Sequence, residues 1–400
     1  MKICLASVHP RMLSGQIEAL VALQSRLESL GHQVVLISAF RSEELRAGRR
    51  WVADVGDGLS LAPKAVRIGR IVSAVAAAAR ECDVLHFNVP TPAFSALADA
   101  VQLLTRRPMI VGYEAHLVAF PAVARRLLRA PEFYGPRLIV NNGLLARMTL
   151  HRASRYVVSS EFQREELHRL GYAPPRVEVI PNLIDESKLA RWNRSEARRA
   201  LGLDVDASVP IVAFVGHYHD VKGHDVLLEA FKRVRTRIPD ARLVLAWSGI
   251  GNRARVEAAI AAAGIGNSVI HLGRSDVSQV YAAADVVALP YRFSIGQAAY
   301  PGTVLEAMWT GAAIVTSDLP LLRELADGGA TATLAEPGDP SSLADRITDL
   351  LVDADRRASL QTAARAAMDV RFNGAALIHR YTAVYEAALA GQPYHALGAL

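Results

Sequence analysis

The chain has 400 residues, of which 51% are hydrophobic and 21% charged, and this composition excludes an intrinsically disordered protein. The length suits two domains, each large enough to bury an ordinary apolar core. The net charge of +6 divides unevenly, because residues 1–200 hold 28 basic and 18 acidic residues whereas residues 201–400 hold 17 and 21. The basic first half indicates an anionic partner, which could be a membrane surface, a nucleic acid or a phosphorylated substrate.

The cysteine content and the apolar segments bear on location. Cys4 and Cys82 are the only cysteines, too few for a disulfide framework or a cysteine-based zinc site, and they suit a reducing cytoplasm. The first ten residues lack the apolar core of a signal peptide. The longest alanine-rich stretch, 71–80, is short of the roughly 20 residues that cross a bilayer. We expect a cytoplasmic protein, at most associated peripherally with the inner face of the membrane.

Short β-branched runs alternate with helix-length amphipathic segments along nearly the whole chain. In the first half, the expected strands are Ile3–Ser7, Val34–Ser38, Val84–Phe87, Met109–Tyr113, Tyr156–Ser159 and Val177–Ile180. In the second half, they are Ile211–Val215, Leu243–Ala246, Val269–Leu272, Val286–Leu289, Ala312–Thr316 and Thr331–Leu334. Continuous apolar strands separated by helices are typical of buried parallel sheets. The sequence predicts an α/β fold with two Rossmann-like, doubly wound domains facing a central cleft, where ligands bind.

The domain boundaries follow from the same alternation of strands and helices. We expect an N-terminal domain over 1–182, a linker over 183–209 with one short charged helix, and a C-terminal domain over 210–372. The last helix, at about 373–400, has no strand after it and is a candidate to pack back on the first domain.

A first candidate site lies in the segment 214–230, where a strand is followed by a turn at Gly216 and by Lys222 and Gly223 at the start of a helix. A lysine at a helix entry, on a loop whose glycines expose backbone N–H groups, is suited to holding a phosphate. A solvated lysine at a helix start is an equally frequent alternative.

A second candidate site lies in the segment 300–318. Gly302 and Thr303 begin a helix, with Thr303 as the expected N-cap and with N–H groups aimed at an anion. Glu306 stands three residues later, at the capping-box position. Glu306 therefore has two interpretations: it satisfies Thr303, or it accepts hydrogen bonds from a ribose diol.

Together these segments resemble the retaining nucleotide-sugar glycosyltransferases of the type-B fold, in the large family numbered four, the glycosyl transferases group 1. The shared motifs, in order along the chain, are Gly31-His32, Ser159-Ser160-Glu161, Ile180-Pro181-Asn182, Gly216 to Lys222-Gly223, Gly249 and Gly251, Leu272-Gly273-Arg274, Ala284-Asp285, Leu305-Glu306-Ala307-Met308 and Pro337-Gly338-Asp339.

The resemblance implies transfer of a sugar from a nucleotide-diphosphate donor to a hydroxyl acceptor, with the anomeric configuration retained. It implies that Lys222 binds the donor diphosphate and Glu306 the ribose. The helix start at Gly302, Thr303 and Val304 would meet the phosphates. The base would lie against the backbone near Gly273 and Arg274, whereas Gly249 and Gly251 are more typical of structural turns.

Two positions of the second half depart from the family pattern. His217 replaces the usual arginine and, being only partly charged at pH 7, neutralises less of a diphosphate; Arg292 is a candidate to supply the missing charge. Ala298 replaces the first glutamate of a pair that contacts the donor sugar. Other residues of the segment from Pro290 to Glu306 would then line that part of the site: Ser294, Gly296, Gln297 or Tyr300.

In the first half, the family commonly places a histidine near the reacting carbon, about where Glu114 stands; here Glu114 or His116 is the candidate. Gly15 lies in the loop that faces the donor in this fold, and the three-glycine dinucleotide fingerprint is absent, which argues against a nicotinamide enzyme. His86 could face the acceptor, although a core histidine is the more frequent outcome. His219 and His224 flank the phosphate loop and are expected to be exposed.

A basic stretch lies between residues 121 and 155, where seven arginines accompany a single acidic residue, Glu132. Arg125, Arg126 and Arg129 are the first three of them. Such a surface suits anionic lipid headgroups or a phosphate-bearing acceptor; solvated helix faces are the alternative. Nucleic acid is disfavoured, because no recognition module appears.

The expected chemistry requires no metal and no cofactor beyond the nucleotide sugar, because a lysine, an arginine and helix N-termini can stabilise a departing diphosphate. Two alternatives remain open: an epimerase of the same fold, and a non-catalytic subunit that binds a nucleotide sugar.

Overall fold

The computed structural model describes residues 1–7, 15–38, 64–89, 95–113, 153–169, 177–203, 206, 208–294 and 299–391. The chain divides into two compact units. Unit 1 comprises Met1–Ile184 and Gly374–Leu400, and unit 2 comprises Asp185–Asn373.

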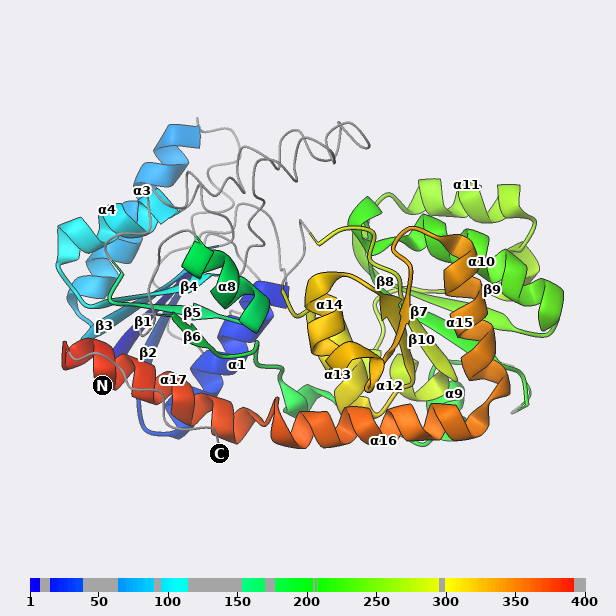
Figure 1. Cartoon of the computed structure of the whole chain (residues 1–400). Helices are drawn as coiled ribbons and strands as arrows, with labels where there is room; N and C mark the ends of the chain where they lie inside the picture. The colour runs from blue at the N-terminus through cyan, green and yellow to red at the C-terminus, as the bar shows by residue number, and fades with distance from the viewer. Residues whose placement is uncertain are drawn as a thin grey trace. The chain divides into compact units, whose positions relative to one another are not determined.

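Unit 1 is built on a parallel sheet with the strand order β2-β1-β3-β4-β5-β6 (Figure 1). The strands are β1 (Lys2–Ser7), β2 (Gln33–Ser38), β3 (Val84–Val89), β4 (Met109–Tyr113), β5 (Arg155–Val158) and β6 (Val177–Val179). The helices are α1 (Gly15–Ser29), α3 (Lys64–Arg80), α4 (Ser95–Thr105), α8 (Glu161–Arg169) and, from the end of the chain, α17 (Gly374–Leu389). The strand order reverses between β1 and β3, as in doubly wound folds.

The two faces of this sheet carry separate cores, because successive side chains of a strand point to opposite faces. Leu85 and Phe87 of β3 pack in the core that α3 and α4 complete. Val84 of β3 and Ile110 of β4 belong to the other core, with residues of α1 and α17. His86 alternates with Leu85 and Phe87 and therefore faces α17.

Helix α17 completes one face of the unit 1 sheet although it comes from the end of the chain. Leu377 and Val384 are buried in that core. Arg380 Nη2 donates to Glu178 Oε1 at 2.7 Å and to the carbonyl oxygen of Val179 at 2.6 Å, which ties the helix to β6. The helix is thus held by both apolar packing and charge.

Unit 2 is built on a second parallel sheet, with the order β12-β11-β10-β7-β8-β9. The strands are β7 (Ile211–Tyr218), β8 (Arg242–Gly251), β9 (Val269–Leu272), β10 (Val286–Leu289), β11 (Ile314–Ser317) and β12 (Thr333–Ala335). The α-helices are α9 (Arg194–Ala200), α10 (His224–Arg237), α11 (Arg253–Ala263), α12 (Val277–Ala283), α13 (Gly302–Thr310), α14 (Pro320–Leu325), α15 (Pro340–Val352) and α16 (Ala354–Val370). Short 3-10 turns are η2 (Glu186–Lys188), η3 (Asp220–Lys222), η4 (Gly266–Ser268) and η5 (Asp327–Gly329).

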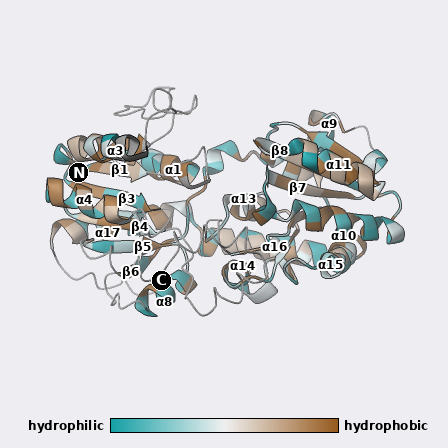
Figure 2. Cartoon of the chain, turned by 90° about the horizontal axis from the view of Figure 1, so that it is seen from above, coloured by the Kyte–Doolittle hydropathy of each residue, from teal (hydrophilic) through white to brown (hydrophobic). Residues whose placement is uncertain are grey.

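The helices of unit 2 bury one apolar stripe each. Leu227 and Phe231 of α10 pack with Ile347 of α15 against Phe214 and Leu245 of the sheet. The solvent side of α10 carries charged residues, and Figure 2 shows hydrophilic and hydrophobic stretches alternating along this helix. This amphipathic pattern holds the helix against the sheet without a fully apolar sequence.

A buried ion cluster attaches the charged helix α9 to the sheet of unit 2. Arg198, only 4% exposed, donates through Nη2 to Asp285 Oδ2 at 3.1 Å, and Arg194 Nη1 lies 2.7 Å from Asp285 Oδ1. The N–H of Ile211, at the start of β7, also donates to Asp285 Oδ2, at 2.8 Å. Asp285, which belongs to one of the motifs quoted above, therefore fixes the start of the first strand of unit 2.

The predicted α/β fold with two doubly wound sheets is confirmed, and each of the twelve expected strands is present. Two strands end three or more residues later than expected: β7 ends at Tyr218 and β8 at Gly251, because these two residues pair beyond an irregularity in the ladder. The charged helix expected in the linker is α9. Among the described residues, we find no helix with the length and apolar character needed to cross a membrane.

Candidate active site

The strand order of unit 2 reverses between β7 and β10, and ligands of open α/β sheets bind outside the carboxyl ends of the strands at such a point. The segment after β7 carries Lys222, at the end of η3. The segment after β10 carries Tyr291 and Arg292. Topology therefore brings these residues together although about 70 positions separate them in the sequence.

Gly223 joins the two segments directly. Its φ of 68° is left-handed, and a Cβ atom at this position would lie 1.9 Å from the carbonyl oxygen of Pro290. The N–H of Arg292 donates to the carbonyl oxygen of Val221 at 3.0 Å, a second backbone link. Only glycine allows this approach, and the approach places Tyr291 beside Lys222.

Tyr291 links Lys222 to the start of α13. Lys222 Nζ donates to the Tyr291 hydroxyl at 3.0 Å and stands 4.5 Å from the centre of its ring. The same hydroxyl lies 2.8 Å from Thr303 Oγ1. The predicted phosphate lysine and the predicted phosphate-binding helix start thus meet through one buried side chain, which is 1% exposed.

The start of α13 differs from the sequence prediction in two respects. The N-cap residue is Pro301, with extended backbone, and Thr303 is the second residue of the helix, so Thr303 as N-cap is wrong. The N–H of Val304 donates to the carbonyl oxygen of Pro301 at 2.9 Å, so it is already used within the first turn. The candidate anion donors of α13 are therefore the N–H groups of Gly302 and Thr303 and the Thr303 hydroxyl.

Glu306 lies one turn into α13. Because the N-cap is Pro301, Glu306 is not at the capping-box position, and that interpretation is wrong. Its Oε2 atom accepts a hydrogen bond at 3.1 Å from the hydroxyl of Tyr281, a buried residue of α12. Tyr281 fixes the carboxylate, and the ribose interpretation stays a prediction.

His217 stands at the end of β7, where its Nδ1 atom is hydrogen-bonded to the hydroxyl of Ser248 on β8. Burial, and then the nearby charge of Lys222, lower the pKa of His217 to about 4. The imidazole is therefore uncharged at neutral pH, not partly charged as expected, and it adds no net charge to the site. His219 is exposed as expected, but His224 is buried, so that expectation is wrong: it opens the apolar stripe of α10.

Arg292 is placed beside the start of α10. Its Nη1 atom donates to Asp225 Oδ2 at 2.8 Å, and its side chain is 34% exposed. Because a surface pair of this kind contributes little stability, the arginine can exchange its carboxylate partner for a more highly charged anion. Arg292 stays a candidate for the charge that His217 lacks.

The remaining donor candidates of unit 2 follow β9, whereas the glycines at the end of β8 are expected to be structural. Gly273 and Arg274 come directly after β9 and are exposed. Gly251 has φ 99°, and a Cβ atom there would lie 2.0 Å from the carbonyl oxygen of Tyr218, so it is a structural glycine as expected. Gly273 and Arg274 are accessible to a ligand, whereas Gly251 is required by the strand pairing.

The loop before α13 is partly described. Tyr300 is 2% exposed; its hydroxyl donates to Glu324 Oε1 at 2.7 Å, and its ring meets Phe372 edge to face. Tyr300 therefore anchors the loop to α14 and does not line an open pocket, which corrects the expectation. Ser294 is also buried, and Gly296, Gln297 and Ala298 lie outside the described residues.

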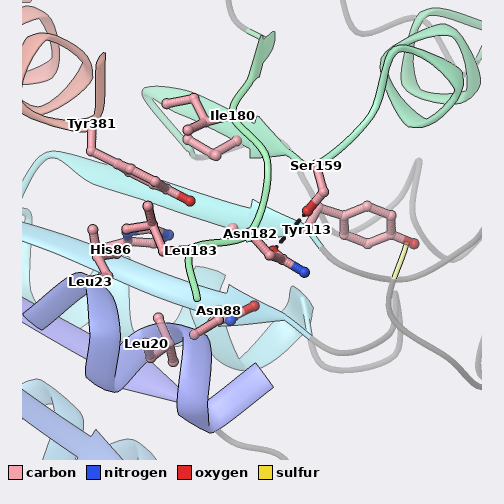
Figure 3. A pocket seen from close by; sticks show the side chains of 13 residues that line it. Leu20, Leu23, His86, Asn88, Tyr113, Ser159, Ile180, Asn182, Leu183 and Tyr381 are labelled. Atoms are coloured by element: carbon pink, nitrogen blue, oxygen red, sulfur yellow. Dashed lines mark hydrogen bonds between the residues drawn. The ribbon is translucent and has the colours of Figure 1, made fainter. Parts of the chain in front are cut away.

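A small polar cavity lies on the α1 and α17 face of the unit 1 sheet (Figure 3). It accommodates about 20 Å³, the space of one water molecule. Its polar lining includes His86, Asn88, Ser159 and Asn182, and the Ser159 hydroxyl donates to Asn182 Oδ1 at 2.9 Å. The cavity is too small for a sugar.

His86 is a core residue, the more frequent of its two expected outcomes. Its Nδ1 atom lies 2.8 Å from the hydroxyl of Tyr385 on α17, and its side chain is buried. Burial lowers the pKa of His86 to about 4, so the ring is neutral at pH 7. Its contact with Tyr385 gives it a structural role that links β3 to the C-terminal helix.

The other candidates of the first half are not all described. Gly15 is the first residue of α1. Glu114, His116 and the basic residues Arg125, Arg126 and Arg129 lie outside the described residues.

Sequence reasoning missed Tyr291, Tyr281 and Ser248, which hold Lys222, Glu306 and His217. Each lies on a different element from the residue it holds, so no local spacing could pair them. A signal was present only for Tyr291, which immediately precedes the candidate Arg292.

Comparisons with known proteins match both halves of the chain to glycosyltransferases. The family model described as Glycosyltransferase Family 4 matches residues 14–188, and the one described as Glycosyl transferases group 1 matches residues 209–353. A D-inositol 3-phosphate glycosyltransferase of Mycobacterium sp. (strain KMS) is 32% identical over 230 residues, which are 54% of this chain and 50% of that protein. The chain therefore spans about half the length of the curated relatives it matches.

Solved structures share the fold over nearly the whole chain. The HepE protein of Anabaena, solved in complex with UDP-glucose, superposes with a TM-score of 0.75 at 18% identity, covering 97% of this chain and 100% of that one. Sucrose-phosphate synthase from Thermosynechococcus elongatus gives 0.75 at 19% identity, covering 98% and 100%. The two family models fall on the two doubly wound units, and the chain belongs to the group 1 glycosyltransferases.

Proposed function

We propose that the protein transfers a sugar from a nucleotide-diphosphate donor to a hydroxyl acceptor with retention of the anomeric configuration. The observation that carries this proposal is the meeting of Lys222 and the start of α13 at the switch point of unit 2. A lysine ammonium and the positive end of a helix dipole converge there, where a diphosphate would carry its charge.

The proposed chemistry is stabilisation of a leaving group. Cleavage of the bond between the anomeric carbon and the diphosphate oxygen leaves negative charge on the diphosphate, and fixed positive groups lower the energy of that state. Lys222, Arg292 and the N–H groups of Gly302 and Thr303 would supply it. We infer that no metal is needed, so we expect turnover to persist in excess EDTA.

The other donor contacts are proposed by family resemblance. Glu306, held by Tyr281, would accept hydrogen bonds from the ribose, and the backbone at Gly273 and Arg274 would meet the base. Gly15 would face the donor from unit 1. Glu114 or His116, after β4, would act near the reacting carbon.

The acceptor is proposed to be anionic and could be attached to a lipid. The basic stretch that begins with Arg125, Arg126 and Arg129 supports this, as does the name of the curated relatives, D-inositol 3-phosphate glycosyltransferase, which includes a phosphate compound. Flotation with anionic liposomes tests a peripheral position at the inner face of a cytoplasmic membrane. Absence of binding even at low salt would remove that part of the proposal.

The donor proposal is tested by thermal unfolding of the protein with UDP-, GDP- and ADP-sugars, because a ligand of the native state raises its melting temperature. We expect one base to stabilise the wild type and Lys222→Ala to lose that shift. If no nucleotide sugar raises the melting temperature of the wild type, the donor site is wrong.

Two further outcomes identify the alternative functions. Conversion of one nucleotide sugar into another without acceptor would identify an epimerase, and binding without turnover on a broad acceptor panel would identify a non-catalytic subunit.

A further inference from the structure

The hydroxyl of Tyr291 lies between two side chains, those of Lys222 and Thr303. It accepts a hydrogen bond from Lys222 Nζ at 3.0 Å, and it lies 2.8 Å from Thr303 Oγ1. Tyr291 is 1% exposed, whereas Lys222 and Thr303 are both partly exposed. The tyrosine is therefore buried, whereas its two partners are accessible to solvent.

The direction of these hydrogen bonds follows from the chemistry of the groups. An ammonium group can only donate, so the Tyr291 oxygen accepts from Lys222. Either hydroxyl can be the donor between Tyr291 and Thr303 Oγ1; when Tyr291 donates, the threonine hydroxyl hydrogen can be donated onward to an anion. Lysine, tyrosine and threonine form a chain in which each donor points toward the start of α13.

The ring of Tyr291 restricts the lysine further. Lys222 Nζ lies 4.5 Å from the ring centre, a distance typical of a cation–π contact. The backbone on both sides of this pair is fixed by Gly223 against Pro290 and by the hydrogen bond between Arg292 and Val221. A long side chain that would otherwise sample several rotamers is thus held in one place before any ligand arrives.

We propose that Tyr291 is a positioning residue, which holds the Lys222 ammonium and the Thr303 hydroxyl together as a preformed site for the terminal phosphate of a nucleoside diphosphate. The inference rests on the proposed function. It goes further in assigning the selectivity for a diphosphate over a monophosphate to a residue that does not touch the ligand.

The experiment compares Tyr291→Phe with the wild type in full-length protein. Dissociation constants are measured for UDP, GDP and ADP and for the corresponding monophosphates. We expect the diphosphate that binds the wild type to lose about five- to tenfold in affinity, and its monophosphate to change less than about twofold. In a Lys222→Ala background, Tyr291→Phe is expected to have no further effect on diphosphate affinity, because the tyrosine acts through the lysine. The four proteins form a double-mutant cycle that measures the coupling between the two side chains.

Tyr281→Phe is the matched control. It removes the same atom from another buried tyrosine of unit 2, one that holds Glu306. Because the ribose is common to both nucleotides, Tyr281→Phe is expected to weaken the binding of the diphosphate and of the monophosphate by the same factor. Thr303→Val is the second probe of the hydrogen-bond chain. It is expected to reproduce the selective loss of diphosphate affinity, even if Tyr291→Phe lowers the melting temperature of the free protein.

The outcomes separate the two proposals. If the wild type binds a nucleoside diphosphate but Tyr291→Phe and Thr303→Val bind it equally well, the positioning role is wrong and the proposed function stands. Equal weakening of the diphosphate and the monophosphate by Tyr291→Phe would also overturn it. If the wild type binds none of the three diphosphates, the proposed function fails and this inference fails with it.

Discussion

The α-carbon of Gly223 lies against the carbonyl group of Pro290, so that no residue with a β-carbon fits between the start of α10 and the loop after β10. Lys222 and Tyr291 stand next to these two residues. The contact therefore determines where the ammonium group is held.

Gly223→Ala should destabilise the protein much more than Gly264→Ala. Both glycines have left-handed backbone, with φ of 68° and 67°, but a Cβ atom at Gly264 would meet nothing within 4 Å. Gly264→Ala is expected to cost about 1–2 kcal/mol from the backbone alone, and Gly223→Ala at least about 2 kcal/mol more from the clash. Urea unfolding measures both; equal losses would show that the loop after β10 moves freely.

Removing the Asp285 carboxylate should destabilise unit 2 strongly. Asp285→Ala leaves Arg198 buried without its charged partner, and we expect a loss of about 3 kcal/mol or more. The control is Asp345→Ala, which breaks a surface pair whose side chains are 57% (Arg237) and 55% (Asp345) exposed. This change should cost less than about 1 kcal/mol. Denaturant midpoints compare the two, and similar losses would contradict a buried structural role for Asp285.

The free energy of unfolding should fall as the pH is lowered from 6.5 to 4. The folded-state pKa of His86 and of His217 is about 4, so in this interval the unfolded chain binds protons that the folded chain does not. By linkage, the contribution of these two histidines to the free energy of unfolding is fully present above pH 6.5 and is lost toward pH 4. For the fully buried His86 the loss amounts to up to about 3 kcal/mol.

The variant His86→Gln isolates this contribution. Its unfolding free energy, measured by urea titration between pH 4.5 and 7.5, should depend less steeply on pH than that of the wild type. Parallel pH curves for the two proteins would mean that the pKa of His86 is the same in the folded and the unfolded state.

Arg292 and Asp225 should have opposite effects on donor binding. If Arg292 supplies charge that the neutral His217 does not, Arg292→Ala weakens nucleoside diphosphate binding several-fold, by about 1 kcal/mol. Asp225→Asn removes the competing carboxylate at 2.8 Å and should leave affinity unchanged or higher. Calorimetric titration gives both values; unchanged affinity in Arg292→Ala, with loss in Lys222→Ala, would exclude Arg292 from the site.

The strands could be predicted because their signal is local. The runs Val269–Leu272, Val286–Leu289 and Met109–Tyr113 have the predicted bounds, since buried parallel strands are continuous apolar segments. The extension of β8 to Gly251 could not be predicted, because it depends on pairing with Tyr218 some thirty residues away.

The site could be predicted only in its charged members. Lys222 and Glu306 are quoted in family motifs, but the tyrosines that hold them carry no motif and act through tertiary contacts. Thr303 was assigned the wrong role because the sequence rules for N-caps favour threonine over proline, whereas the extended backbone of Pro301 starts the helix two residues earlier.

Helix α17 gives unit 1 a particular order of assembly during synthesis. The sheet of unit 1 is synthesised before unit 2, but Leu377, Val384 and Tyr385, which cover one of its faces, are synthesised after all of unit 2. Unit 2 is continuous in sequence and can fold while that face is still open. The nascent chain therefore exposes the apolar surface around Ile110 and the His86 ring until α17 has been synthesised, and this face is where a chaperone would be needed.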